Sequence, residues 1–332
     1  MRAVVVEQPG GLDRLQLLDR PAPEPGPQEV LVRVAYAAVN WSDVQKRQGI
    51  YPDPVTYPAV LGAEVAGEVI GLGPDVPRRL LHRRVAALCG AHLLGGCADS
   101  VAVPRDYLIP VPSGIGLASA AALPLAALTA YHLLHTAHRL RRGEVILVHA
   151  AAGSVGLALT QLAHRRGVKV IGTVGGPGKV DVPRRYGASL VIDRSREDFV
   201  EAAMSFTDGR GVDLVIDSLG GEILPRSFDC LRRFGRLINI GEASGEPAFP
   251  VRKKLYERST SMAGFEVLHA TPGSPRWRRG VRSVAAHAAR GELSVPIDRI
   301  VPLAEVARAH AALESRQTVG KILLDLGVEG VQ

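Results

Sequence analysis

Cysteine is scarce in this sequence of 332 residues, which contains only Cys89, Cys97 and Cys230. Three cysteines form no disulfide framework, so the pattern favours a reduced, intracellular compartment. The first residues, MRAVVVE, begin a strand pattern at once and show no apolar core of a signal peptide. Together these features predict a cytoplasmic protein.

The sequence also lacks a membrane-spanning run and a tract suited to nucleic acid. Its longest apolar stretch, IGLASAAALPLAALTAYHLL from Ile115, is rich in alanine and contains Pro124, which favours a buried helix over a membrane span. The net charge of +7 arises from scattered basic residues that are not interleaved with aromatic residues. This distribution favours a solvated surface over a nucleic-acid-binding tract.

Two patterns divide the chain. Up to about residue 112, apolar runs such as EVLVRVAYAAV alternate with clusters such as RPAPEPGPQ, which predicts an irregular β-barrel or sandwich. Beyond about Ser113, strands such as EVILVHA and VKVIGTV alternate with helices, which predicts a parallel sheet wound on both faces. The tail after about Met262 reads as strand, helix, strand and is expected to return to the first domain.

The stretch AAGSVG, residues 151–156, predicts a nucleotide-binding turn between a strand and an amphipathic helix. Gly153 lets the backbone approach a pyrophosphate, and Gly156 lets the helix pack closely on the strand. The N–H groups of the first helical turn, which includes Ser154 and Val155, would point at the phosphates. A tight turn without a ligand is the weaker alternative, because further strand–helix units follow.

No acidic residue directly follows the second strand, where a dinucleotide site usually carries one for the ribose hydroxyls. The first acid after Thr173 is Asp181. A carboxylate would repel a ribose 2′-phosphate, whereas Thr173 can donate a hydrogen bond. Positive charge nearby comes from Lys179, Arg184, Arg185 and Arg194. Each arginine alone fits a surface charge better than a ligand. Together with the missing acid, they favour NADP(H) over NAD(H).

Longer motifs are more specific than the glycine turn. On AAVNWSDVQKRQGIYP, LGAEVAGEVIGLG, LTAYHLL, HAAAGSVGLALTQLA and ALESRQTVGKILL, the chain resembles the zinc-free quinone oxidoreductase family of the medium-chain dehydrogenase/reductase superfamily. The resemblance covers essentially the whole chain. It implies an α/β fold with a GroES-like β-rich substrate domain (1–122 and 262–332) and a doubly wound parallel-sheet Rossmann domain (123–261). It also implies bound NADPH and a homodimer.

The resemblance further implies which residues contact the cofactor. The family's ligands of the NADPH phosphate align with Lys179 and Arg316, and a family tyrosine aligns with Arg194, which keeps a donor and adds charge. Thr129 matches a residue near the nicotinamide ring. The positions around the nicotinamide ribose and carboxamide match two segments, Asn239 to Gly241 and Phe265 to Val267.

Zinc-dependent members of the superfamily hold a catalytic metal with a Cys, a His and a later Cys or Asp. Those places read Asn40, Ala63 and an apolar stretch near Leu125 here, and Cys89 and Cys97 cannot complete a structural zinc site alone. No metal is therefore expected. Three histidines spaced by three on one predicted helix are expected to serve as polar-face or core residues: His132, His135 and His138.

Without a Lewis acid, reduction of an isolated ketone lacks the usual means of stabilising the alkoxide. Hydride addition to a conjugated acceptor spreads the charge into an enolate or hydroquinone oxygen, which hydrogen bonds can stabilise. The sequence thus predicts an NADPH-dependent reductase of enones, enoyl thioesters or quinones. A role in polyketide or other biosynthesis, with or without ring closure, stays open. The rival hypothesis is a nucleotide-binding protein without turnover, such as a structural or RNA-binding relative.

In the resembled family, the substrate pocket is lined from the segment that reads VNWSDVQKRQGIY here. Asn40 matches a family Asn that contacts cofactor or substrate. Tyr51 matches a pocket Tyr and is the candidate donor to the developing enolate, with packing in a proline-rich loop as the alternative. A second family Tyr aligns with Gln45, which cannot act as an acid, so the source of the proton stays open between Tyr51 and water.

Overall fold

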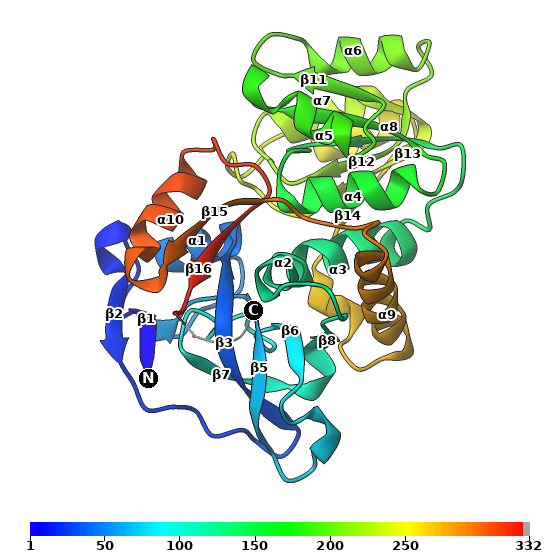
Figure 1. Ribbon diagram of the computed structural model, residues 1–332. Helices are drawn as coiled ribbons and strands as arrows, with labels where there is room; N and C mark the ends of the chain where they lie inside the picture. Colours follow the sequence, from blue (N-terminus) through cyan, green and yellow to red (C-terminus); the bar gives the residue numbers. More distant parts are fainter. Residues whose placement is uncertain (328–332) are drawn as a thin grey trace. The chain divides into compact units, whose positions relative to one another are not determined.

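The structure is a computed structural model and describes residues 1–327. It divides into two compact units (Figure 1). Met1–Leu128 and the segment from Thr271 onward form the first unit, and Thr129–Ala270 forms the second. The sequence predicts the breaks earlier, after residues 122 and 261.

Both boundaries differ from the predicted ones for a structural reason. The main-chain N–H of Leu125, at the start of α3 (Pro124–His132), donates to Glu64 Oε2 at 2.7 Å and ties this turn to the first unit. At the other boundary, β14 (Ser261–Gly264) pairs in parallel with β13 (Leu231–Asn239) and extends the sheet of the second unit. A linear pattern shows neither partner, so the sequence places both breaks too early.

The central strand of the first unit is β3 (Glu29–Val39), which pairs antiparallel with β5 (Glu64–Leu72), β7 (Ser100–Pro104) and β16 (Lys321–Asp325). Alternate valines of β3 are fully buried in the core of this unit, because successive side chains of a strand point to opposite faces. Further strands extend this sheet or form a small sheet of order β2–β1–β4: β1 (Arg2–Val6), β2 (Gln16–Asp19), β4 (Ala59–Val60), β6 (Arg84–Leu88), β8 (Leu108–Pro110) and β15 (Ile297–Pro302).

The tail of the chain returns to this sheet, as its pattern predicts. β15 pairs in parallel with β16, and β16 pairs antiparallel with β3, with Leu323 opposite Ala38. The α-helices of the first unit begin and end as follows: α1 (Trp41–Gln48), α2 (Leu117–Ala121), α9 (Pro275–Ala289) and α10 (Val306–Glu314).

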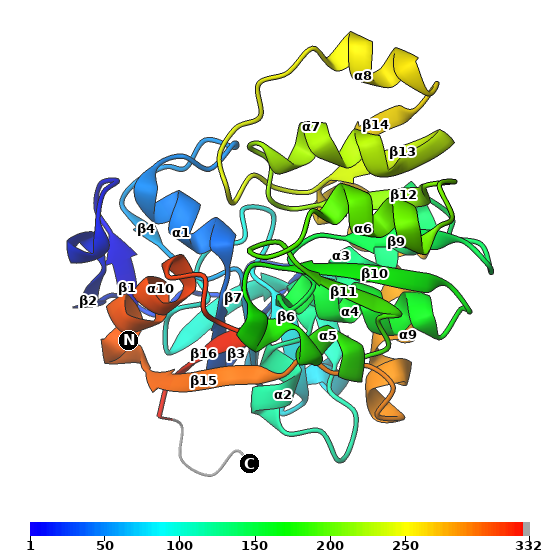
Figure 2. The same cartoon turned by 90° about the horizontal axis from the view of Figure 1, so that it is seen from above.

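The second unit contains a parallel sheet of order β11–β10–β9–β12–β13–β14, with helices connecting and covering the strands (Figures 1 and 2). Its inner strands are continuous apolar runs because helices cover both faces of a doubly wound sheet. Its remaining strands are β9 (Val145–Val148), β10 (Lys169–Val174), β11 (Leu190–Asp193) and β12 (Val212–Asp217). Its remaining helices are α4 (Ser154–His164), α5 (Asp181–Arg185), α6 (Phe199–Phe206), α7 (Ile223–Ser227) and α8 (Val251–Glu257).

The strand order of this sheet reverses between β9 and β12, and ligands of such sheets bind where the carboxyl ends of the strands meet at the reversal. The glycine turn follows β9 at that edge. In the described part of the chain, no helix combines the length and the apolar character needed to cross a membrane.

Candidate functional site

The glycine turn connects β9 to α4 with the geometry that the motif predicts. Gly153 is the N-cap of α4 in an extended conformation, and no side chain within residues 1–327 caps this helix start. A Cβ added to Gly156 would lie 2.6 Å from the carbonyl oxygen of Ala150, which only a glycine avoids. Ser154 and Val155 are half-buried in the first turn of α4. The open N-terminus of α4 is therefore suited to phosphate oxygens.

The strand β10 carries a small residue, Gly172, near its carboxyl end because of close packing. A Cβ on Gly172 would lie 2.7 Å from Cβ of Ala151 in the glycine turn, so a larger residue at this position would push the turn away from β10. The sequence alone suggests only that this strand end is small and neutral. The structure adds that Gly172 also lets the glycine turn lie close to the sheet.

Thr173 lies beside this turn, but its hydroxyl belongs to a buried chain of hydrogen bonds. Ser227 donates its proton to Ile223 O at 2.7 Å, so its oxygen accepts from Nε2–H of His149 at 2.9 Å. Nδ1 of His149 is then unprotonated and accepts the hydroxyl proton of Thr173 at 2.8 Å. Burial, with a smaller contribution from the charge of Arg194, lowers the pKa of His149 to about 3 and keeps it neutral.

These hydrogen bonds change the role that the sequence suggests for the Thr173 hydroxyl. Its side chain is fully buried, and the proton that it would offer to a ribose phosphate is already donated to His149.

The two predicted phosphate-binding cations of this unit, Lys179 and Arg194, lie in different surroundings. Lys179 ends a single helical turn, Pro177–Lys179, and is half-buried. Arg194 follows β11, and its Nη2 lies 3.7 Å from the Cβ position of Gly175 after β10.

Arg184 is a surface charge, as the sequence favours for each arginine taken alone. It is exposed on α5 and pairs with Asp181 at 3.4 Å, a contact between two solvated side chains. The first acid after β10 is thus occupied with a neighbouring surface charge. Arg316, the third predicted phosphate ligand, lies in the first unit on the turn after α10 with a positive φ of 57°.

Two polar residues end neighbouring strands at the carboxyl edge of the sheet. Asp217, the last residue of β12, is buried and accepts from the N–H groups of Leu219 and Gly220, and its pKa is raised by burial. Asn239, the last residue of β13, donates to Asp217 Oδ2 at 3.0 Å and to Gly241 O at 2.9 Å. The sequence motifs predict Asn239 and Gly241 as site residues but not Asp217, although an acid at the end of an apolar strand is a signal that a sequence can show.

The remaining predicted residues of the second unit take these positions. The N–H of Phe265 donates to the carbonyl of Asn239 at 3.0 Å, which holds the segment after β14 against the end of β13. Val267 is buried in the next turn. Thr129 is buried within α3.

In the first unit, the three sequence positions that correspond to metal ligands of zinc-dependent relatives lie around the carboxylate of Glu64. Glu64 Oε1 accepts from Asn40 Nδ2 at 3.1 Å, and Glu64 Oε2 accepts from the N–H of Leu125 at 2.7 Å. Ala63 is the residue before Glu64. The Lys321 ammonium completes the cluster, 2.8 Å from Glu64 Oε1 and 2.6 Å from Asn40 Oδ1. All three charged or amide side chains are at most 8% exposed.

This arrangement does not fit a zinc ion. Alanine and leucine side chains have no donor atom, and the amide of Asn40 is bonded to Glu64 and Lys321. A buried ammonium at this place would also repel a cation. The sequence predicts Asn40 as a site residue but not Glu64 or Lys321, because no pattern along the chain pairs two residues that lie 257 positions apart.

Asn40 also starts α1, and Asp43 holds this start in place. The Asp43 carboxylate accepts from the N–H of Asn40 at 2.9 Å and from the N–H of Gly62 at 3.2 Å. Burial raises the pKa of Asp43. The Asp43 side chain therefore fixes the backbone at both Asn40 and Gly62.

Tyr51, the candidate proton donor, is half-buried in the loop after α1. The Lys46 ammonium lies 4.8 Å from the centre of its ring, and the same ammonium donates to His92 O and Leu93 O at 2.7 Å each. This contact supports the packing alternative for the ring and leaves the role of the hydroxyl as a prediction. Gln45 is half-buried on α1.

The three histidines spaced by three do not converge. Nδ1 of His135 lies 2.8 Å from Tyr131 O, and Nε2 of His138 lies 3.0 Å from a carboxylate oxygen of Glu144. Nδ1 of His132 lies 3.0 Å from Thr136 Oγ1. Each ring thus has a separate protein partner. No group of metal-ligating side chains is found among residues 1–327.

Comparison with known proteins matches both units. Residues 26–113 match the model of the alcohol dehydrogenase GroES-like domain, and residues 186–324 match the model of a zinc-binding dehydrogenase. A quinone oxidoreductase of Pseudomonas aeruginosa is 37% identical over 320 residues, which cover 95% of this chain and 96% of that protein. The chain belongs to the zinc-free quinone oxidoreductase family.

Other known proteins match over similar lengths. A 2-haloacrylate reductase of a Burkholderia species is 33% identical, covering 97% of this chain and 98% of that protein. The structure of Escherichia coli quinone oxidoreductase complexed with NADPH has a TM-score of 0.92 and 31% identity, covering 98% of this chain and 100% of that chain. The predicted pairing of a GroES-like unit with a Rossmann unit is thereby confirmed.

Proposed function

We propose that this protein is an NADPH-dependent, zinc-independent reductase that adds hydride to an activated C=C bond or to a quinone. The observation that carries the proposal is the cluster of Asn40, Glu64 and Lys321 at the place of the metal ligands. This cluster supplies no Lewis acid for an isolated alkoxide, so the acceptor must spread its own developing charge. The names of the relatives, a quinone oxidoreductase and a 2-haloacrylate reductase, are consistent with such acceptors.

The second unit has features that suit NADPH. The uncapped start of α4 and the close approach allowed at Gly153 and Gly156 suit a pyrophosphate. The guanidinium of Arg194 beside Gly175 suits a 2′-phosphate, with Lys179 and Arg316 as further ligands. When bound, NADPH supplies the hydride. Binding of NADPH by the related E. coli enzyme supports this choice.

Proton delivery and positioning fall to residues of the chain. Tyr51 would donate a hydrogen bond or proton to the developing enolate, with water as the alternative source because Gln45 cannot act as an acid. Thr129, Asn239 and Phe265 would contact the nicotinamide half of the cofactor.

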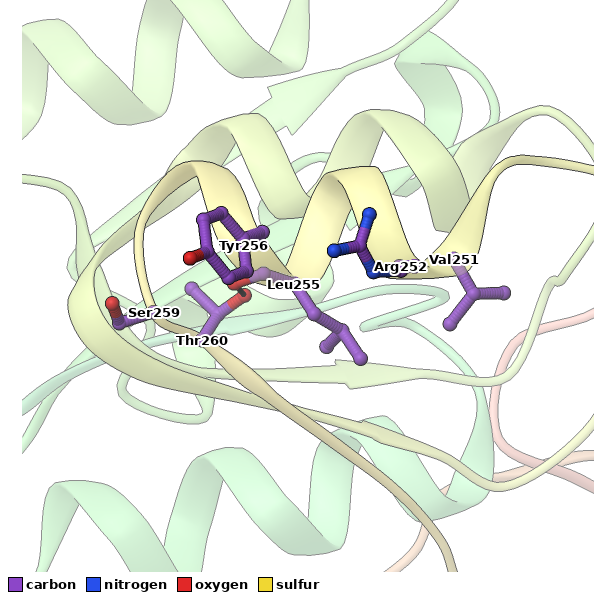
Figure 3. Close-up of a pocket in the computed structure, with 6 residues that line it drawn as sticks. All are labelled: Val251, Arg252, Leu255, Tyr256, Ser259 and Thr260. Atoms are coloured by element: carbon purple, nitrogen blue, oxygen red, sulfur yellow. Dashed lines mark hydrogen bonds between the residues drawn. The ribbon is translucent and has the colours of Figure 1, made fainter.

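We also propose that the protein forms a homodimer through the β14 edge of its second unit. β14 is the last strand of the sheet within the described residues, and apolar side chains beside it are exposed: Val251, Tyr256 and Met262. The helix α8 and the turn after it line a hollow of about 580 Å³ in this region. Figure 3 shows the side chains that line it. Its lining residues are Val251, Arg252, Leu255, Tyr256, Ser259 and Thr260. An exposed strand edge with apolar neighbours is suited to pairing with a second chain.

The deciding experiment is oxidation of NADPH, followed by its near-ultraviolet absorbance, with a panel of quinones, enones, a 2-haloacrylate and an enoyl thioester. We expect turnover with at least one conjugated acceptor, none with an isolated ketone, and no loss of activity with chelators. NADPH binding without turnover on any acceptor would favour the rival hypothesis of a nucleotide-binding protein. A preference for enoyl thioesters over quinones would favour the biosynthetic role.

A further inference from the structure

Four arginines line a second hollow of the second unit, which has a volume of about 500 Å³. This volume is in the range of small-molecule sites. The lining residues are Gly209 and Arg210 in the loop after α6, Arg232 and Arg233 in β13, and Glu257 and Arg258 at the end of α8. The function proposed above uses none of them.

An irregularity in β13 shapes one wall of this arginine hollow. In the register with β12, residues 232–235 of β13 lie opposite the single residue Asp213. The N–H of Phe234, within this bulge, donates to Arg258 O at 3.1 Å, and Arg258 Nη1 donates to Leu231 O at 2.7 Å. These two hydrogen bonds hold the bulge against the end of α8, so the fold fixes the backbone of the hollow.

The Asp213 carboxylate orients two of the four guanidinium groups. Asp213 is 5% exposed and accepts from the main-chain N–H of Val145 at 2.8 Å. It also accepts from Arg210 Nη2 at 3.0 Å and from Arg232 Nε at 2.5 Å. Arg210 uses only Nη2, and Arg232 uses only Nε and Nη1, so each keeps N–H groups without a partner within residues 1–327. The fold therefore orients these donors before any ligand binds.

The hollow also carries more positive charge than the neighbouring carboxylates neutralise. Arg233 is exposed, and its side chain makes no hydrogen bond or ion pair with the described residues. Glu257 is exposed and equally unpaired in this part of the chain. Four guanidinium groups against two carboxylates, those of Asp213 and Glu257, leave an excess of two positive charges.

We infer that the arginine hollow binds a small molecule that carries two or more linked phosphate groups. Guanidinium groups present paired N–H donors that match phosphate oxygens, and a di- or triphosphate has oxygens for several of them at once. Asp213 lies near the amino end of β12 and Asp217 at its carboxyl end, about 13 Å apart at a rise of about 3.3 Å per residue. The site is thus at the opposite edge of the sheet from the glycine turn, and the inference does not depend on the proposed function.

Single substitutions separate this site from general surface charge. Arg233→Gln removes a cation without breaking a contact of the fold, and Arg233→Lys keeps the charge without the paired donors. Glu257→Gln removes the carboxylate that would repel the ligand. Arg184→Gln is the matched control, because it removes an exposed arginine of the same unit that pairs with Asp181 outside the hollow.

The probe is inorganic tripolyphosphate, titrated by calorimetry at low ionic strength with enough NADPH present to fill one nucleotide site per chain. We expect one tripolyphosphate to bind per chain. Arg233→Gln should weaken its Kd by about tenfold because one charged contact is lost, and Arg233→Lys should weaken it less. Glu257→Gln should tighten the Kd by about threefold, as for an exposed charge pair. Arg184→Gln should leave the Kd unchanged, and every variant should keep the wild-type Tm.

No saturable binding by the wild type, or equal effects of Arg233→Gln and Arg184→Gln, would overturn the inference. The arginines would then only offset the partial negative charge at the carboxyl ends of α6 and α8. A nucleoside triphosphate tells two sources of the phosphate groups apart: tighter binding than that of tripolyphosphate assigns a nucleotide, and equal or weaker binding assigns an inorganic polyphosphate. If the proposed function fails and no NADPH binds, the same titration of the free protein and its variants still tests the hollow.

Discussion

Thr173 Oγ1 and His149 Nδ1 lie 2.8 Å apart, and the proton between them belongs to the threonine. The direction follows from Ser227, whose own proton is donated to Ile223 O and whose oxygen must therefore accept from the other ring nitrogen. A single buried imidazole thus links the strand after the glycine turn to α7. The hydrogen bonds from Thr173 through His149 and Ser227 to Ile223 O therefore have one consistent arrangement of protons.

Thr173→Val should destabilise the protein. The substitution leaves Nδ1 of the buried His149 without a donor, which costs about 1–3 kcal/mol in unfolding free energy. Thr160→Val is the matched control, since Thr160 is equally buried but its hydroxyl only donates back to Gly156 O in its own helix. Chemical denaturation of both variants checks this, and equal losses would mean that the hydrogen bond to His149 contributes nothing specific.

Stability should fall in acid partly because of His149. Its pKa is about 3 in the folded state, and about 6.5 is ordinary for an unfolded chain. Between these values the unfolded state binds the extra proton, so the contribution is complete above about pH 6.5 and is lost as pH falls toward 3. Removing this histidine, in His149→Gln, should reduce the loss of unfolding free energy as pH falls below 6.5, with a slope that approaches about 1.4 kcal/mol per pH unit near pH 5. Urea denaturation at several pH values measures it; parallel curves for both proteins would contradict the assignment.

NADPH should bind more tightly than NADH by about tenfold or more, because a charged, hydrogen-bonded phosphate contact contributes roughly 1.5–3 kcal/mol. Arg194→Ala should remove most of this preference by weakening NADPH binding alone. Arg184→Ala should not, because Arg184 is exposed and paired with Asp181. Fluorescence titration of both nucleotides with each variant decides the matter, and equal affinities in the wild type would contradict the NADPH assignment.

Tyr51→Phe should lower kcat by about tenfold with little change in NADPH affinity, if the hydroxyl stabilises the developing enolate. Quinones should be affected least, because the hydroquinone anion is stabilised by its own ring. Steady-state kinetics with one enone and one quinone provides the comparison. Wild-type rates on both would leave Tyr51 with the packing role that its contact with Lys46 supports.

The double variant Tyr256→Glu/Met262→Lys should be monomeric if the β14 edge forms the dimer. These side chains are 80% and 36% exposed, so the charges should not disturb the fold of one chain. Ile300→Glu is the control, since Ile300 is a similarly exposed apolar residue of the first unit. Analytical ultracentrifugation of the three proteins gives the answer. A wild type that sediments as a monomer would end the dimer proposal.

Local motifs in the sequence predict much of this structure. The glycine turn, the alternation of strands and helices and the returning tail were readable because each depends on neighbouring residues. The role of the Thr173 hydroxyl could not be predicted from the sequence, because Ser227 directs its proton through His149. His149 and Ser227 lie 78 positions apart in the chain. The ion pair of Lys321 with Glu64 was missed for the same reason. Hydrogen-bond direction in a buried network is a property of the folded arrangement, and no pattern along the chain encodes it.

The pairing of β16 with β3 also has a consequence for synthesis of the chain. A ribosome completes β3 early, yet the strand that covers its edge emerges only after all of the second unit has been made. Until then, β3 presents unpaired main-chain groups and the carboxylate of Glu64 lacks its cation. The nascent first unit is therefore the part that needs protection from aggregation, whereas the partners within Thr129–Ala270 are all available once that segment has emerged.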